Sequence, residues 1–122
     1  MANLISRSFD QADERRTPPK AQVDVVMLDG TNAARLVLQP GWRWSECIKP
    51  IVGTETCQVR HVGHAVAGTL HLTHTDGTEI DVVAGDGYVI EPGHDAWVVG
   101  DEAFVSFEFE SETAKHYAET PA

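Results

Sequence analysis

The chain has 122 residues and a formal net charge of −10 at pH 7, from 19 acidic side chains against 9 lysines and arginines. This length fits one domain with its own core. The charge excludes nucleic acid and anionic membrane surfaces as expected partners, because binding a polyanion requires basic side chains. No apolar run reaches the ~18 residues of a membrane span, and the N-terminus lacks the pattern of a secretory signal. We therefore expect a cytoplasmic protein.

The N-terminal third begins with a polar segment and continues into short apolar runs. Residues 1–22 carry few apolar side chains and predict an arm that lies on the surface or on a partner subunit. The runs at 23–28 and 33–38 flank Asp29-Gly30, a pair typical of hairpin turns. Trp42 and Trp44 follow at a spacing of two, which places both on one face of an extended segment.

The rest of the chain repeats this pattern of short extended runs and turn residues. Further strands are expected at residues 58–66, 69–73, 79–83, 88–90, 96–99 and 103–110. The last run alternates cleanly, with Val105, Phe107 and Phe109 on one face and Ser106, Glu108 and Glu110 on the other. Turn signals about every ten residues and roughly eight to ten strands predict an all-β sandwich or barrel over residues 23–112, followed by a polar tail at 113–122.

One stretch carries side chains suited to chemistry. Glu55, Cys57 and His61 stand at spacings of two and four, so they share one face if the segment is extended. Carboxylate, thiolate and imidazole are all ligands of transition metals. About thirty residues later, His94 follows the turn residues Pro92-Gly93. We expect these two segments to form one pocket.

The spacing of these segments resembles the two motifs of the cupin superfamily of jelly-roll barrels. Gly68 matches the glycine that closes the first motif, G-x5-H-x-H-x3,4-E-x6-G. Residues 85–96 follow the second, G-x5-P-x-G-x2-H-x3-N, with Ala96 where a histidine is expected. The resemblance covers roughly residues 33–110. It looks closest to the subgroup that includes ureidoglycine-handling enzymes, and also to uncharacterised stand-alone bacterial cupins, and it implies a jelly-roll β-barrel.

The four ligand positions of the family all carry other residues here. The usual histidines fall at Glu55 and Cys57, the usual glutamate at His61, and the fourth ligand at Ala96. His94 has the same parity as Ala96, so it is placed to replace the lost ligand. The resulting set of Glu55, Cys57, His61 and His94 suits zinc, iron, nickel or copper. The alternative is a pocket without metal, lined by Cys57 and His61.

The remaining cysteine and histidines are weaker candidates for a site. On a straight strand the Cα atoms of Cys57 and His61 lie about 13 Å apart, too far for a direct hydrogen bond. This distance disfavours a nucleophile–base pair and means that metal binding needs a bulge, a bend or a change of strand between the two residues. A Cys47–Cys57 disulfide is not expected in a reducing compartment. His64 has the wrong parity, His71 and His74 flank the Asp76-Gly77 turn, and His116 lies in the tail, so we expect none of these four histidines to be a ligand.

Two functions remain open at this stage. One is a metal-dependent enzyme acting on a small polar acid, sugar or ureide, in keeping with the resemblance. The other is a non-catalytic module that binds a small ligand without metal. In either case Trp42, Trp44, Tyr88 and Trp97 are expected to line the pocket. We also expect a homodimer, because small sandwiches must cover exposed edge strands, and deletion of residues 1–22 should weaken it.

Overall fold

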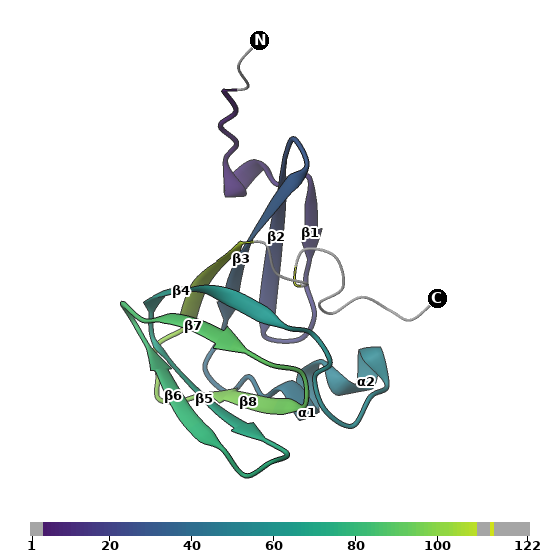
Figure 1. The fold of residues 1–122 in the computed structure, drawn as a ribbon, viewed down its shortest axis with the longest axis vertical. Helices are drawn as coiled ribbons and strands as arrows, with labels where there is room; N and C mark the ends of the chain where they lie inside the picture. The colour runs from purple at the N-terminus through teal and green to yellow at the C-terminus, as the bar shows by residue number, and fades with distance from the viewer. Residues whose placement is uncertain (1–3, 110–112, 114–122) are drawn as a thin grey trace.

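The chain folds into two antiparallel sheets that enclose one core (Figure 1). The computed structural model describes residues 4–109 and 113. The larger sheet has the strand order β1 (Glu14–Arg16), β2 (Ala21–Leu28), β3 (Thr31–Leu38), β9 (Phe104–Phe109), β4 (His61–Ala67) and β7 (Gly87–Ile90). The smaller sheet has the order β6 (Glu79–Val83), β5 (Thr69–His74) and β8 (His94–Val98). The expected all-β jelly-roll architecture is confirmed.

The hairpin predicted at Asp29-Gly30 joins β2 to β3 with a two-residue turn. Leu28 pairs with Thr31 directly across it. Both turn residues have positive φ, 50° at Asp29 and 88° at Gly30, as a turn that follows the right-handed twist of its strands requires. Asp76-Gly77 likewise lies between β5 and β6, which pair from Thr73 and Glu79 onward.

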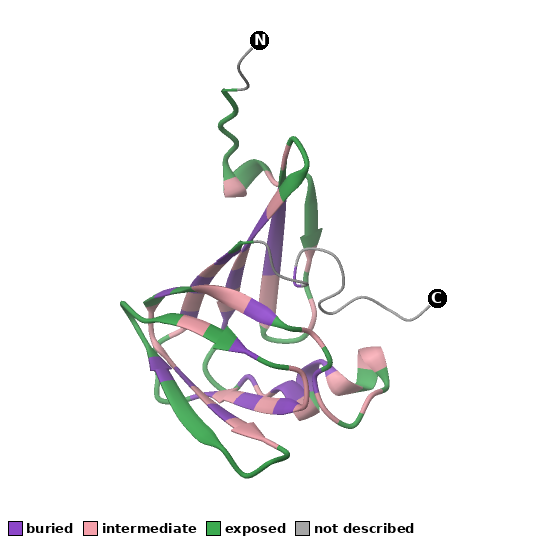
Figure 2. Ribbon diagram, viewed as in Figure 1, coloured by how far each residue is buried: buried purple, intermediate pink, exposed green. Residues whose placement is uncertain are grey.

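The core lies between the inner faces of the two sheets (Figure 2). Strand β9 contributes a partly polar inner face. Ser106 and Glu108 are 0% and 3% exposed, whereas Phe109 is 47% exposed. The opposite face of β9 carries Val105, Phe107 and Phe109 and points outward. There the centroid of the Phe107 ring lies 5.2 Å from that of the Phe9 ring. The polar face of the last strand therefore faces the centre of the barrel.

The N-terminal segment is partly built into the larger sheet. A short 3-10 helix, η1 (Phe9–Gln11), precedes β1. Arg15 on β1 reaches the fully buried carboxylate of Asp24 on β2, at 2.5 Å between Nε and Oδ1. Residues 4–8 extend away from the barrel (Figure 1), and Leu4 is 93% exposed.

The tryptophan segment forms short helices instead of a strand. Trp44 begins α1 (Trp44–Cys47), and α2 (Lys49–Val52) follows directly and ends at Gly53, whose φ is 79°. Trp42 and Trp44 are both buried, and Arg43 between them is extended, with φ −141° and ψ 131°. Among the described residues, no helix has the length and apolar character needed to span a bilayer.

Candidate metal centre

Three metal-binding side chains converge inside the barrel, namely Cys57, His61 and His94. One potential ligand atom of each lies within 4.8 Å of those of the other two. All three residues are buried, with exposed fractions of 2%, 4% and 4%. His61 is the first residue of β4 and His94 the first residue of β8, so the two sheets supply one imidazole each.

A change of sheet between Cys57 and His61 brings these two side chains together. The amide of Cys57 donates to the carbonyl of His94 at 2.9 Å, and the amide of Gly93 donates to the carbonyl of Cys57 at 2.8 Å. Cys57 is thus held at the edge of the smaller sheet, whereas His61 belongs to the larger one. Sγ of Cys57 lies 3.7 Å from Nε2 of His61. The long separation expected for one straight strand does not apply, because the chain changes strand between the two residues as metal binding requires.

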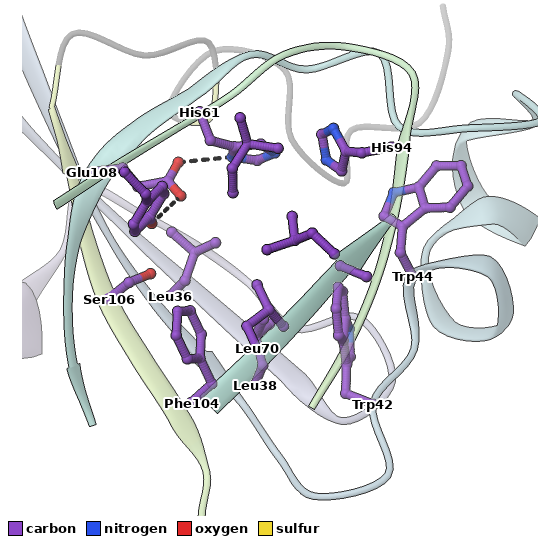
Figure 3. A pocket seen from close by; sticks show the side chains of 14 residues that line it. Leu36, Leu38, Trp42, Trp44, His61, Leu70, His94, Phe104, Ser106 and Glu108 are labelled. Carbon is purple, nitrogen blue, oxygen red and sulfur yellow. Dashed lines mark hydrogen bonds and ion pairs between the residues drawn. The ribbon is translucent and has the colours of Figure 1, made fainter. Parts of the chain in front are cut away.

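Each imidazole is oriented by a contact at Nδ1. Nδ1 of His61 lies 2.8 Å from Oε1 of Glu108 and 2.7 Å from Oγ1 of Thr113. Nδ1 of His94 lies 2.7 Å from the carbonyl oxygen of Glu91, to which it donates. Nε2 is therefore the nitrogen of each ring left for a ligand. Figure 3 shows His61 and His94 on the same side of the cavity, with Glu108 beside His61.

Glu108 is itself fixed by further hydrogen bonds. The hydroxyl of Tyr88 donates to Oε2 of Glu108 at 2.6 Å, and the hydroxyl of Thr113 donates to Oε1. Gly63 leaves the room for this arrangement, because a Cβ atom there would lie 2.8 Å from both Glu108 Cγ and Tyr88 Oη. Protein hydrogen bonds therefore hold the buried carboxylate in one position and take the place of solvent.

The electrostatics of the centre favour charged forms that stabilise one another. Burial acts to lower the pKa of His61, but the charge of Glu108 and the contact with Cys57 outweigh it and raise the pKa to about 10. Burial acts to raise the pKa of Cys57, but hydrogen bonds to His61 and His94 lower it to about 6. Burial likewise opposes ionisation of Glu108, yet His61, Thr113 and Tyr88 keep its pKa below the ordinary value. The same burial and the charge of Glu108 raise the pKa of Tyr88, which stays a donor.

Comparison with known proteins identifies the fold. No protein-family model and no curated protein matches this chain. Among solved structures, a Rhizobium leguminosarum protein of unknown function superposes with a TM-score of 0.61 at 17% identity, over 88% of this chain and 97% of the other. An RmlC-like cupin from Shewanella frigidimarina gives a TM-score of 0.54 at 15% identity, over 82% and 84%. The chain has the cupin fold.

A third neighbour is larger than this chain. An oxalate decarboxylase from Lactobacillus farciminis, solved as a formate complex, superposes with a TM-score of 0.58 at 17% identity. The match covers 88% of this chain but only 34% of the decarboxylase. At these identities the likeness establishes the cupin fold and not the activity, since one fold hosts many functions.

Two of the residues expected in the cupin pocket lie outside it. The side chain of Glu55 is 93% exposed and pairs with Lys49 at 3.0 Å, because residue 55 sits in the loop before Cys57 enters the sheet. Trp97 alternates with the inward Ala96 on β8 and so faces outward. Its ring lies 4.1 Å from the guanidinium carbon of Arg43. Trp42, Trp44 and Tyr88 do line the interior cavity.

The remaining histidines and the second cysteine lie away from the cluster. His64 is exposed, and His71 pairs with Glu79 and Asp81 on the outer face of the smaller sheet. Nε2 of His74 lies 2.8 Å from the carbonyl oxygen of Pro92. Cys47 and Cys57 are both free thiols. His116 lies outside the described residues.

The cavity inside the cupin barrel is small. Its free volume is about 30 Å³, walled mainly by leucines and aromatic rings, as Figure 3 shows. This space suits an ion or a water molecule, which needs roughly 10–15 Å³. It is well below the roughly 300–1,000 Å³ of typical small-molecule pockets. A larger groove of about 340 Å³ lies alongside, and His94 lines both spaces.

Proposed function

We propose that this cupin binds one transition metal ion through Cys57, His61 and His94. The observation that supports it best is the pair of contacts at Nδ1 of the two histidines. Metal-binding histidines almost always donate their other N–H to a carboxylate or a backbone carbonyl. His61 has Glu108 in that role and His94 has the carbonyl of Glu91.

The donor set fits a borderline metal. Two ligands of a tetrahedral zinc ion lie about 3.3 to 3.6 Å apart, given the usual Zn–N and Zn–S bond lengths. The 3.7 Å between Cys57 Sγ and His61 Nε2 is close to this separation, and the limit of 4.8 Å for the whole set requires a shift of at most about 1.5 Å for the third ligand. One thiolate and two imidazoles favour zinc, iron, nickel or copper over magnesium or calcium.

Three protein ligands leave a fourth position for water or substrate, as in catalytic zinc sites. The ion would supply a Lewis acid at that position. Glu108 would hold the proton on Nδ1 of His61. The apolar side chains of Leu36, Leu38 and Phe104 would keep bulk water out of the cavity. This arrangement supports a metal-dependent reaction on a small molecule, of which acids, sugars and ureides are the classes expected from the sequence.

The test is elemental analysis of untagged protein purified without added metal, together with cobalt titration. We expect about one equivalent of a transition metal, and a thiolate-to-cobalt absorption band in the cobalt form. Cys57→Ser should abolish the band, and His61→Ala and His94→Ala should lower metal content. Cys47→Ser is the matched control, because Cys47 is also a free buried thiol but lies outside the cluster. Absence of metal in the folded wild type, with no cobalt band, would contradict the proposal.

A second candidate follows from the same residues without an ion. Cys57, His61 and Glu108 form a thiol–imidazole–carboxylate series, the arrangement of enzymes with a cysteine nucleophile. If the metal assays are negative, rapid alkylation of Cys57 near neutral pH that is lost in His61→Ala would favour this candidate. Slow alkylation of Cys57 would leave the non-catalytic binding module.

A further inference from the structure

A groove with a free volume of about 340 Å³ opens beside the candidate metal centre. The β5–β6 hairpin forms one wall and the end of β7 forms the other. Strands β6 and β7 are edge strands of the smaller and the larger sheet (Figure 1). The inner end of the groove is His94. A volume of this size lies within the range of small-molecule pockets, roughly 300–1,000 Å³.

The apolar residues that line the groove are only partly buried. Leu72 and Ile90 are buried at its base, whereas Ile80 and Val89 are 46% and 51% exposed. Ile80 lies on the same face of β6 as the buried Val82, so its partly exposed side chain faces the groove. Branched aliphatic side chains held open at the mouth of a cavity provide a surface for the body of an organic ligand.

The polar groups of the groove select by charge. Asp76 and Glu91 stand at its rim, with side chains 64% and 62% exposed. Thr73, His74 and Thr78 complete the lining, which includes no lysine or arginine among the described residues. Arg60 lies beside the rim, where it pairs with Glu91 at 3.3 Å. With a net charge of −10 on the whole chain, the rim repels a carboxylate and attracts a cation.

We propose that the groove binds a small molecule with an apolar body and a protonated amine. The amine lies at the rim near Asp76, and the body covers Leu72, Ile80 and Val89. Because the inner end of the groove is His94, such a ligand reaches the metal centre, and its role as a substrate rests on the proposed function. Of the substrate classes expected from the sequence, simple acids fit this groove least.

Ligand binding is tested by NMR titration of the ¹⁵N-labelled full chain, as purified and after treatment with a chelator. The probes are benzylammonium, benzoate and benzyl alcohol, which share one ring and differ in charge. Benzylammonium should shift the amides of Thr73, Thr78 and Val89 and bind at least about tenfold more tightly than benzoate, as expected for opposite against like charge. Asp76→Asn should weaken benzylammonium and leave benzyl alcohol unchanged.

A matched pair of variants on β6 locates the site. Ile80→Lys places a cation in the groove and should lower the affinity for benzylammonium at least about tenfold. Val83→Lys makes the same charge change on the same strand, at a 42% exposed residue on the opposite face, and should leave the affinity within about twofold. The metal content of the same samples is measured in parallel, so a failure of metal binding is distinguished from a failure of ligand binding.

Three outcomes would overturn the inference. The first is benzoate binding as tightly as benzylammonium to the chelator-treated protein. The second is an equal loss of affinity in Ile80→Lys and Val83→Lys. The third is the absence of localised shifts with all three probes at millimolar concentration while the protein stays folded.

Discussion

Oε1 of Glu108 lies 2.8 Å from Nδ1 of His61, and this contact determines which nitrogen of the imidazole faces Cys57. With Nδ1 directed at Glu108, Nε2 is the nitrogen that faces the centre of the barrel, and it presents a lone pair there once a metal ion displaces its proton. Glu108 is 3% exposed and has no solvent to share its charge. The carboxylate therefore acts on the site through His61, as a positioning residue.

Replacing Glu108 with glutamine should lower metal affinity about tenfold or more, the usual effect of removing a carboxylate behind a metal-binding histidine. The side chain keeps its size, so the barrel should stay folded. The measurement is a cobalt or zinc competition titration against a chromophoric chelator. Ser106→Ala is the control, because Ser106 lies on the same inner face of β9 and does not contact His61 in any observed hydrogen bond. Equal affinities for Glu108→Gln and wild type would show that the contact is structural only.

Thr113 should affect metal affinity through His61 less than Glu108 does. Its hydroxyl lies 2.7 Å from Nδ1 of His61 and also bonds Glu108, and its carbonyl accepts from Arg16 at 3.1 Å. Thr113→Val should reduce metal affinity by a few-fold, on the order of one neutral hydrogen bond, and Thr113→Ser should restore it. Loss of affinity in both variants would point to packing of the methyl group instead of the hydroxyl.

The sequence predicted the architecture well because its signals were local. Alternation along the strands and the Asp-Gly turns act within a few residues, and the structure has the expected hairpins. The site was harder to predict because it depends on contacts between distant residues. The even spacing of His94 and Ala96 correctly predicted that both side chains face the interior. The same argument wrongly predicted an inward side chain for Glu55, since Glu55 precedes the point where the chain joins the smaller sheet.

The inward face of β9 shows why Glu108 escaped prediction. Residues 104–109 alternate, so two faces were evident, but alternation does not tell which face is buried. Hydrophobicity alone would make Val105, Phe107 and Phe109 the core face. The structure reverses this, because Phe9 covers Phe107 on the outside while His61 and Tyr88 satisfy Glu108 inside. A buried carboxylate paired with a histidine is a property of the fold and not of the local sequence.

Asp24 should make stability depend on acid pH. Burial acts to raise its pKa, but bonds from Arg15, Gln22 and Arg35 hold it below the ordinary 3.8. A lowered pKa stabilises the fold fully above about pH 5, and this contribution is lost as the pH falls through the pKa of the folded state. At pH 7, Asp24→Asn should cost about 2 to 3 kcal/mol, since both arginines keep some exposure to solvent.

Urea unfolding at pH 7, 5, 4 and 3 measures this effect. The difference in unfolding free energy between wild type and Asp24→Asn should hold down to about pH 5 and shrink below pH 4. Asp101→Asn, a change of the same kind at an exposed residue, should show no such difference. A difference for Asp24→Asn that is independent of pH would mean that ionisation of Asp24 contributes nothing.

Gly68 and Gly77 should respond very differently to alanine, although both have positive φ, 78° and 95°. A Cβ atom at Gly68 would lie 2.8 Å from Cα of Phe104, whereas at Gly77 it would meet nothing within 4 Å. Gly77→Ala should cost only the strain of the left-handed conformation, about 1 to 2 kcal/mol. Gly68→Ala must also displace backbone of β9 and should cost several times as much or prevent folding. Thermal unfolding of the two variants decides this, and equal losses would contradict the close packing of Gly68.

The exposed N-terminal residues should matter for association and not for folding. Leu4 and Ile5 are 93% and 46% exposed, which is consistent with an arm that lies on a second copy of the chain. Deletion of residues 1–22 would also remove Arg15 and its bond to Asp24, so the sharper test removes only residues 1–8.

We expect light scattering to give the mass of a dimer for the full chain and of a monomer for this truncation. Leu4→Ser combined with Ile5→Ser should weaken the dimer without shortening the chain. A dimer that survives both changes would place the interface elsewhere, and a full chain that scatters as a monomer would exclude the homodimer.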